Sequence, residues 1–316
     1  MPDVVTLGET MALFAPREAG PLRYVSEFRL KLGGAESNFA TALVRLGVSA
    51  GWISRLGTDG LGHFIAHHLR GEGVDLSQVV FDPEAPTGLY VKELSAAGES
   101  SAYYYRRGSA ASRLRPDDVD ASYLRGARWL HLTGITPALS DSCRATVEHA
   151  IEVARSAGLS VSFDPNLRLK LWSVERAREL LVPIMKRCTV LLGGAEELGR
   201  LLQVEGPNDS VDWALRHDIP LVAVKLGGKG ALVATEYERR TVPAFEVPTV
   251  LDAIGAGDGF DAGFVAGQLG GWDPWRSAEL GNCVGAHSLM VHGDYEGYPS
   301  LAEAEAFMVG QARVTR

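Results

Sequence analysis

A regular alternation of short apolar runs with amphipathic segments constrains the fold of this chain more than any other feature. The apolar runs predict strands at residues 4–7, 51–55, 129–133, 161–164, 190–192 and 221–225, and helical patterns lie between them at 37–46, 61–72, 143–157, 173–185, 196–202 and 210–216. Strands that alternate with helices are typical of a mostly parallel sheet. These strands are apolar along their length, which indicates that helices cover both faces of the sheet. We therefore predict an α/β fold.

Two segments break this alternation. Residues 21–32 and 87–107 read as strands with no helix between them, and the second segment predicts a hairpin that turns at residues 97–99. We expect about 10–32 and 87–110 to form a small β-sheet inserted in the core of a single domain that spans residues 1–316. Such a sheet could close over a site as a lid, or pair with another subunit.

Composition argues against several classes of function. The net charge is −8 and no basic run is present, so no nucleic-acid partner is expected, because phosphate binding requires a concentrated basic surface. The most apolar stretch, residues 180–192, contains Lys186 and Arg187, so no membrane partner is expected. The chain starts without the basic and apolar regions of a secretory signal, and its cysteines show no CxxC spacing. A cytoplasmic location with buried thiols is the expectation.

The strongest local motif is Gly255-Ala256-Gly257-Asp258, which opens a helix that we expect to run to about residue 269. The first N–H groups of a helix have no partner within it, and small residues let a ligand approach the backbone, so the helix start is a candidate anion hole. Asp258 could accept a proton from a hydroxyl that attacks a phosphoryl group. An acidic residue there could equally complement the helix dipole. The spacing matches neither the Walker phosphate loop nor the dinucleotide fingerprint.

Two further motifs offer groups to a polar ligand. Gly33-Gly34 with Asn38 could bind sugar hydroxyls through bare backbone and an amide, or could form only a tight strand-to-helix turn. Lys225 with Gly227 and Gly230 could lie along a nucleotide, or could form only a hairpin turn.

Two arginines are candidates for binding an anionic group. Arg168 follows the turn Asp164-Pro165-Asn166 at the end of a predicted strand, where ligands bind in open parallel sheets. Arg106 follows Tyr103-Tyr104-Tyr105, and strand alternation places Tyr104 and Arg106 on one face and Tyr103 on the other. An aromatic cross-strand cluster with solvated arginines is the simpler alternative. Two arginines in one pocket would imply an anionic ligand group, because a guanidinium matches carboxylate or phosphate.

Taken in order along the chain, these motifs resemble the ribokinase-like sugar kinases, also called PfkB carbohydrate kinases. The resemblance spans about residues 3–310. It rests on the glycine pair with Asn38, the Asp-Pro-Asn turn, the Lys-x-Gly-x-x-Gly strand end and the Gly-Ala-Gly-Asp helix start. It implies a ribokinase-like three-layer α/β/α core with a small β-sheet lid, ATP as donor, a magnesium ion (Mg2+) bound mainly through the phosphates, and homo-oligomers formed through the lid.

The motifs are most similar to those of family members that phosphorylate 2-keto-3-deoxygluconate. This closer likeness rests on residues 33–38, 103–106, 132–139, 164–168 and 171–172, and on Gly293-Asp294. It implies ATP-dependent phosphorylation of the terminal 6-hydroxyl of this sugar acid, giving 2-keto-3-deoxy-6-phosphogluconate. The alternatives are a ribokinase-like or fructokinase-like kinase of a neutral sugar, a kinase of the epimeric 2-keto-3-deoxygalactonate, and a non-catalytic sensor on the same scaffold.

The resemblance also assigns roles by position. Asp258 would be the catalytic base, and Gly255, Ala256 and Gly257 would form the anion hole. Substrate contacts would come from Gly33, Gly34, Asn38, Tyr90, Tyr103, Tyr104, Arg106, Arg168 and Asp294. ATP would lie against Asn166, Lys225, Gly227, Gly230, Asn282 and the helix start formed by Gly255, Ala256 and Gly257.

The resemblance places cations with two acidic residues. Glu197 would act indirectly on the magnesium ion, and Asp252 would serve a possible monovalent cation. Near each of these acidic residues, one position departs from the family pattern. Ala253 stands where a threonine is usual, which puts potassium dependence in question. Gly194 stands where an asparagine is usual, so the contact of Glu197 with magnesium is expected to be weaker or mediated by water.

Overall fold

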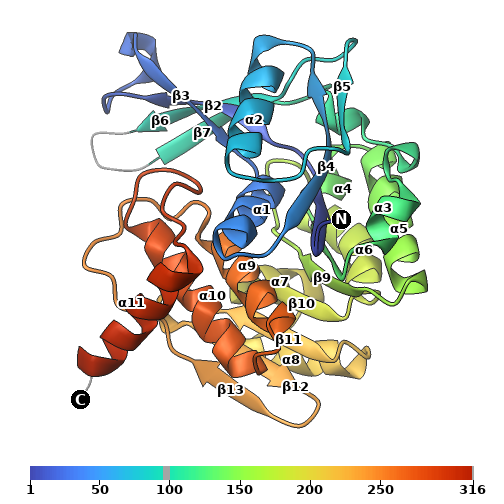
Figure 1. Ribbon diagram of the computed structural model, residues 1–316, viewed down its shortest axis with the longest axis vertical. Coiled ribbons are helices and arrows are strands. Elements are labelled where there is room, and N and C mark those ends of the chain that lie inside the picture. The colour runs from blue at the N-terminus through green and yellow to red at the C-terminus, as the bar shows by residue number, and fades with distance from the viewer. Residues whose placement is uncertain (95–99, 315–316) are drawn as a thin grey trace.

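The computed structural model describes residues 1–94 and 100–314, and their strands form two sheets (Figure 1). The large sheet has nine strands in the order β13-β12-β11-β10-β9-β8-β1-β4-β5. In chain order these strands are β1 (Val4–Leu7), β4 (Ala50–Gly57), β5 (Val79–Asp82), β8 (Trp129–Thr133), β9 (Ser160–Asp164), β10 (Val190–Gly194), β11 (Leu221–Lys225), β12 (Ala231–Thr235) and β13 (Arg239–Val242). Pairing is parallel from β5 to β11 and antiparallel across β12 and β13.

Helices cover both faces of the large sheet, which confirms the predicted three-layer architecture. One hydrophobic core packs against α3 (Ala121–Arg125), α5 (Asp141–Ser156), α6 (Val174–Met185), α7 (Ala195–Leu202) and α8 (Pro207–Arg216). The other packs against α1 (Ala35–Arg45), α2 (Gly60–Gly71), α9 (Ala256–Leu269), α10 (Pro274–Leu289) and α11 (Leu301–Val314). The short α4 (Thr136–Leu139) precedes α5.

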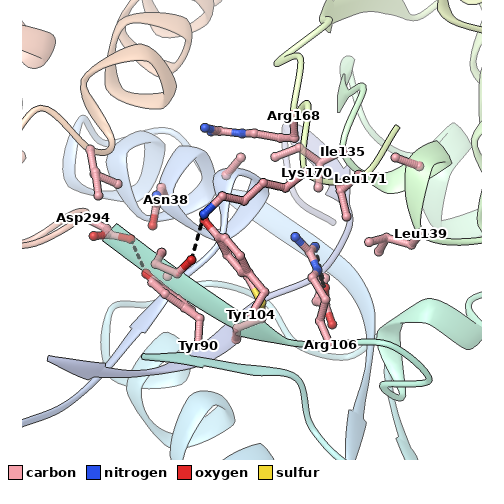
Figure 2. Close-up of a pocket in the computed structure, with 18 of the residues that line it drawn as sticks. Asn38, Tyr90, Tyr104, Arg106, Ile135, Leu139, Arg168, Lys170, Leu171 and Asp294 are labelled. Atoms are coloured by element: carbon pink, nitrogen blue, oxygen red, sulfur yellow. Dashed lines mark hydrogen bonds and ion pairs between the residues drawn. The ribbon is translucent and has the colours of Figure 1, made fainter. Parts of the chain in front are cut away.

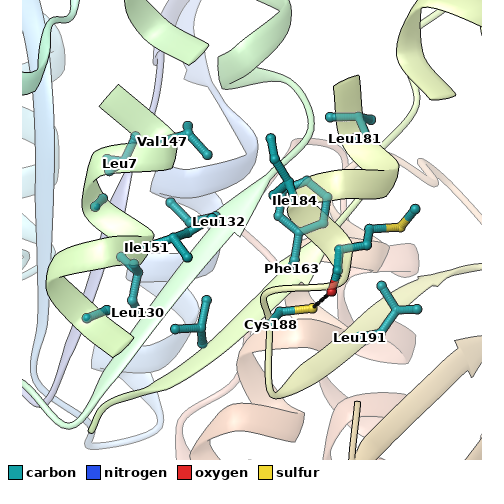
Figure 3. Packing of buried hydrophobic residues seen from close by; sticks show 14 of the residues in the cluster. Leu7, Leu130, Leu132, Val147, Ile151, Phe163, Leu181, Ile184, Cys188 and Leu191 are labelled. Carbon is teal, nitrogen blue, oxygen red and sulfur yellow. Dashed lines mark hydrogen bonds between the residues drawn. The ribbon is translucent and has the colours of Figure 1, made fainter. Parts of the chain in front are cut away.

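Strand alternation divides the apolar side chains between the two cores. On β10, Leu191 belongs to the first core, whereas Val190 and Leu192 belong to the second. Figure 3 shows the first core, where Phe163 of β9 lies between Leu132 of β8 and the side chains of α6. The three cysteines are buried free thiols, as predicted.

The small sheet has the order β3-β2-β6-β7, with β2 (Met11–Pro16), β3 (Phe28–Gly33), β6 (Leu89–Leu94) and β7 (Ser100–Tyr105). These strands come from the two segments that the sequence assigns to it, and the antiparallel pairing of β6 with β7 confirms the hairpin. The predicted turn at residues 97–99 lies outside the described residues. Residues 22–24 form a 3₁₀ turn instead of a strand, because they follow Pro21, which cannot donate to a ladder.

Each strand and helix expected from the alternation is present, with ends shifted by up to three residues. The pattern did not predict β5, β12, β13, α10 or α11. Within residues 1–94 and 100–314, no helix is long and apolar enough to cross a membrane.

Candidate active site

A cavity of about 660 Å³ lies between the small sheet and the core. This volume is within the usual range for a small-molecule site. In Figure 2, Arg168 and Lys170 lie on the side of the core, facing Tyr90, Tyr104 and Arg106 of the small sheet. Most of the predicted substrate and catalytic residues line the cavity: Gly33, Gly34, Asn38, Tyr90, Tyr104, Arg106, Arg168, Asp258 and Asp294.

Asp258 lies in the first turn of α9, and both of its carboxylate oxygens face amides. Asn38 Nδ2 donates to Oδ2 at 2.8 Å, and Asn166 Nδ2 lies 3.5 Å from Oδ1. The side chain is 8% exposed. Burial raises the pKa of Asp258 to about 6, and the hydrogen bond from Asn38 opposes this shift. An ionised carboxylate at neutral pH beside a helix start is suited to act as a general base.

The backbone at the start of α9 has a shape that requires glycine. Gly255 has φ 82°, and a Cβ on it would lie 1.8 Å from the carbonyl oxygen of Asp294. The hydroxyl of Tyr298 donates to the Gly255 carbonyl at 2.6 Å and fixes this turn. The N–H groups that follow, at Ala256 and Gly257, belong to the first turn of α9 and have no partner within the helix. This geometry fits an anion hole.

Lys225 lies beneath this helix start, where several charged side chains meet at the ends of parallel strands. Its ammonium is 2.7 Å from Asp164 Oδ2 and 3.1 Å from Asp261 Oδ1. Burial alone would lower the pKa of Lys225, but Asp164 and Asp261 raise it. Burial raises the pKa of Asp261 well above its usual range, and the neighbouring Lys225 opposes this shift.

The ammonium of Lys225 is therefore paired with carboxylates, and its predicted place along ATP stays a prediction. It lies 3.4 Å from the point where Gly257 would carry a Cβ, so its charge is directly behind the anion hole. The same strand ends carry Glu197, whose pKa is raised by burial and by Asp164 and whose carboxylate accepts from Gly194 N at 3.3 Å.

A magnesium ion could be held here only in part by protein. Asp164 and Glu197 supply carboxylate oxygens at the strand ends, but the described chain has no cluster of three or more His, Cys, Asp or Glu side chains that could enclose a metal. Hard oxygen ligands with few protein donors fit magnesium bound chiefly through phosphates.

The other predicted ATP residues lie outside the cavity lining. Gly227 and Gly230 form the turn of the β11–β12 hairpin, and a Cβ on Gly230 would lie 2.0 Å from the carbonyl oxygen of Val242. Asn282 of α10 donates its amide to the carbonyls of Val242 and Pro243, at 3.1 and 2.9 Å. These residues hold β13 and the loop after it against α10. The glycines do form a hairpin turn, and the contact of these residues with a nucleotide stays a prediction.

The sugar end of the cavity is built from the small sheet and the C-terminal loop. Tyr90 donates to Asp294 Oδ2 at 2.7 Å, and its ring stacks on Tyr104 with centroids 5.5 Å apart. A Cβ on Gly33 would lie 2.3 Å from both Asp294 and Tyr90 oxygens, so only glycine fits there. Burial raises the pKa of Asp294, which the neighbouring Lys92 opposes.

Tyr103 lies on the opposite face of the small sheet, away from the cavity. Pairing places it in one row with Val91, Phe14 and Leu30. Its hydroxyl donates to Glu93 at 2.8 Å. Of the two predicted tyrosines, Tyr104 therefore lines the cavity and Tyr103 does not, because alternation in β7 turns only one of the two rings inward.

The two arginines differ in their partners. Arg106 Nε donates to Glu9 Oε2 at 2.6 Å, and Ser109 donates to the other oxygen of this buried carboxylate. The guanidinium of Arg168 makes no hydrogen bond or ion pair with any described residue, although its charge lowers the pKa of Asp258. The prediction of two arginines at the cavity is correct in position, but only Arg168 has an uncompensated charge.

Four charged residues of this region were missed by sequence reasoning: Arg107, which lines the cavity, and Glu9, Lys170 and Lys92. Glu9 partners Arg106, and Lys170 Nζ donates to the Ala102 carbonyl of β7 at 2.8 Å. Lys92 Nζ lies 3.0 Å from Asp294 Oδ1 and 3.4 Å from Asp252 Oδ2. Lys92 and Lys170 lie on a strand and a turn that carry predicted site residues, whereas Glu9 does not. The partners of all three are distant in sequence, so no local motif identifies them.

Glu36, in the first turn of α1, is fully buried behind the cavity. Thr133 and Thr136 donate to its Oε1 at 2.7 and 2.8 Å. Burial raises the pKa of Glu36 to about 7. Its Oε2 has no partner among the described residues, which fits a carboxyl that holds a proton over part of the neutral range.

The sequence matches the family described as pfkB family carbohydrate kinase over residues 1–301. It is 37% identical over 314 residues to a 2-dehydro-3-deoxygluconokinase of Bacillus subtilis, covering 99% of this chain and 97% of that protein. It is 34% identical to a 2-dehydro-3-deoxygalactonokinase of Haloferax volcanii, covering 92% of each.

Solved structures give the same similarity. The fold matches a ribokinase II from Escherichia coli in complex with ATP and magnesium with a TM-score of 0.92 and 26% identity, covering 98% of this chain and 100% of that one. It also matches a double mutant of the fructokinase from Vibrio cholerae with fructose, ADP and potassium bound, with a TM-score of 0.85 and 27% identity, covering 97% and 99%.

Proposed function

Since this chain belongs to the pfkB family of carbohydrate kinases, we propose that it transfers the γ-phosphoryl group of ATP to the terminal 6-hydroxyl of 2-keto-3-deoxygluconate. The product is 2-keto-3-deoxy-6-phosphogluconate. The observation that carries this choice of substrate is Arg168, a guanidinium without a partner among the described residues that lies in the cavity near Asp258. The name of the Bacillus subtilis relative supports the same choice.

A sugar acid fits this cavity better than a neutral sugar. An unpaired cation at a ligand site is stabilised by a carboxylate, and a planar guanidinium suits two-oxygen recognition. Tyr90, Tyr104 and Asp294 would then contact hydroxyl groups along the substrate, with Asn38 near the reacting end. A ribose or fructose would leave Arg168 without an anionic partner.

In the proposed reaction Asp258 accepts the proton of the 6-hydroxyl. The hydroxyl oxygen forms a bond with the γ-phosphorus, and the bond from that phosphorus to the bridging oxygen breaks, so ADP leaves with the bonding electrons. The N–H groups of Ala256 and Gly257, with the ammonium of Lys225 behind them, stabilise the charge on the transferring group. Magnesium, when bound through the phosphates near Asp164 and Glu197, would neutralise part of the same charge.

The small sheet would act as a lid that excludes water, and the nucleotide would lie over the start of α9 with Asn166, Gly227, Gly230 and Asn282 along its course. Use of ATP fits a cytoplasmic location.

The outer face of the small sheet is a candidate contact between two copies of the chain, through the row formed by Leu30, Phe14, Val91 and Tyr103. Light scattering of wild type and Tyr103→Glu would test this contact.

An ADP-release assay tests the proposed function directly. It would compare 2-keto-3-deoxygluconate, 2-keto-3-deoxygalactonate, fructose and ribose with ATP and magnesium. We expect turnover on the keto acids and not on the neutral sugars, with the gluconate epimer favoured. Asp258→Asn should reduce kcat by about 10²–10⁴-fold while ligand binding remains, because general-base catalysis has this typical size.

A matched control is Asp273→Asn. Asp273 caps the neighbouring helix α10, accepting from Trp275 N and Arg276 N, and asparagine caps helices equally well. This variant should keep wild-type turnover. Turnover by Asp258→Asn close to that of the wild type would exclude Asp258 as the base, and turnover confined to a neutral sugar would exclude the proposed substrate.

A further inference from the structure

Lys92 is a buried lysine of the small sheet that no step of the proposed reaction uses. It extends from β6 to two carboxylates on other parts of the chain, Asp294 in the C-terminal loop and Asp252 in the loop before α9. The lysine side chain is 8% exposed, and the two carboxylates are 4% and 20% exposed. Burial would lower the pKa of Lys92, but Asp294 and Asp252 raise it, so the amine is an ammonium.

All four oxygens of these two carboxylates already face donors. Asp252 Oδ1 accepts from Ile254 N at 3.1 Å, and its Oδ2 faces the ammonium of Lys92. Asp294 Oδ2 accepts from the hydroxyl of Tyr90, and its Oδ1 accepts from Lys92 at 3.0 Å. An added cation at these oxygens would lie beside the ammonium of Lys92, whose charge repels it.

The monovalent cation that the family resemblance implies at Asp252 therefore does not fit this chain. The ammonium of Lys92 already stands against Asp252, and Ala253 provides no hydroxyl as a further oxygen ligand. One ammonium with three donors supplies the positive charge that such an ion would bring.

We propose that Lys92 replaces a monovalent cation in this enzyme, acting as a positioning residue for the loop that leads into the anion hole. Its ammonium fixes Asp252, and Asp252 in turn holds Ile254 N, one residue before the left-handed turn at Gly255. Because Lys92 belongs to β6, this loop is ordered only when the small sheet is in place over the cavity. Turnover should then be independent of potassium.

The first measurement compares wild-type turnover in potassium chloride and in choline chloride at equal ionic strength. We expect the two rates to agree within about twofold, because a covalently attached charge is present in both salts. This part rests on the proposed kinase activity, so it uses whichever sugar acid is turned over.

The second measurement uses Lys92→Met and does not require a substrate. Removing the ammonium leaves two buried carboxylates without a cation, so potassium should bind there and raise the melting temperature relative to choline, by mass action. The melting temperature of wild type should not differ between the two salts. In choline, Lys92→Met should also lose about ten- to a hundredfold in kcat, the size of a lost charge-assisted hydrogen bond, and potassium should restore part of it.

Two further variants separate charge from packing. Lys92→Arg keeps a cation and should remain indifferent to potassium. Lys31→Met removes another lysine that runs from the small sheet to the C-terminal loop, where it pairs with Glu296 at 2.6 Å outside the cavity. This variant should also show no response to potassium, because Lys92 is intact.

Strong activation of wild type by potassium, above about fivefold, would overturn the proposal, and so would a Lys92→Met protein whose stability ignores potassium. If Lys92→Met does not fold, wild type and Lys92→Arg still decide the matter through their salt dependence. A failure of the proposed substrate would appear as absent turnover in both salts, which leaves the melting comparison unaffected.

Discussion

The positively charged side chains on the two sides of the cavity differ in whether they are paired with carboxylates. On the side of the small sheet, Lys31, Lys92 and Arg106 each reach a carboxylate outside that sheet, at Glu296, Asp294 and Glu9. On the side of the core, Arg168 has no partner among the described residues. These three cations therefore attach the small sheet to the core, whereas Arg168 of the core is available to a ligand.

Two buried lysines show the same contrast within the protein interior. Lys225 lies between Asp164 and Asp261, on β11, β9 and α9, which are all parts of the core. Lys92 lies between Asp294 and Asp252 but comes from β6 of the small sheet. The first cluster lies wholly within the core, while the second joins the small sheet to two loops outside it. Similar chemistry thus serves stability in one place and positioning in the other.

The largest expected effect tests this division. Lys225→Met should lower the free energy of unfolding by about 3–5 kcal/mol, because it leaves buried carboxylates without their cation. Lys92→Met should cost clearly less, since Asp252 is partly exposed and the small sheet can move to admit water. Urea denaturation of both variants measures the difference. Equal losses would show that the two clusters do not differ in role.

The arginines give the next largest effect. Arg168→Ala should raise KM for the sugar acid about ten- to a hundredfold, the size of a lost charge-assisted hydrogen bond, and leave stability unchanged. Arg106→Ala should instead lower stability as well, because it leaves Glu9 buried without a cation. Steady-state kinetics paired with denaturation would separate them. An Arg168→Ala enzyme with wild-type KM would contradict the assignment of a carboxylate to Arg168.

The sequence predicts the core side of the cavity better than the contacts between the small sheet and the core. The start of α9 is a local motif in which Gly255 to Asp258 are consecutive, so the sequence alone identifies both the anion hole and the candidate base. The strands are predictable because continuous apolar runs mark their burial. Arg168 is placed at the cavity because it follows a strand end, and the position of a strand end is a property of the whole parallel sheet.

The residues that were missed are the partners of the predicted ones. Glu9 and Arg106 are 97 positions apart, and Lys92 and Asp294 are 202 apart. No short-range spacing relates them, because it is the tertiary fold that brings the small sheet and the core together. The position of Tyr103 outside the cavity was missed for a related reason, since the register of β7 against β6 decides which ring faces inward.

The pH dependence of turnover tests Asp258, the carboxylate that two amides hold in the cavity. Asp258 must be ionised to accept a proton, so its pKa of about 6 predicts full activity above that pH. Below it, kcat/KM should fall about tenfold for each pH unit, as the protonated fraction grows. A profile of kcat/KM from pH 5 to 8 measures this.

Glu36→Gln is the control for this profile. Glu36 has a pKa of about 7 but is buried behind the cavity. Its replacement should therefore leave the midpoint of the kcat/KM profile near the pKa of Asp258, about 6. A midpoint near the ordinary aspartate value of about 4 would contradict the role of burial at Asp258.

The smallest effect is expected at Lys170, the cation that crosses the cavity from the core toward the small sheet. Its ammonium donates to the carbonyl of Ala102 and lies 5.4 Å from the centre of the Tyr104 ring, with no carboxylate as partner among the described residues. Exposed contacts of this kind contribute about 0.5–1 kcal/mol. Lys170→Met should therefore raise KM by no more than about fivefold, and Lys170→Arg should be closer still to wild type. A loss as large as that of Arg168→Ala would mean that the core presents two cations to the substrate carboxylate, and that the contrast between the two sides of the cavity is stronger than the unliganded contacts indicate.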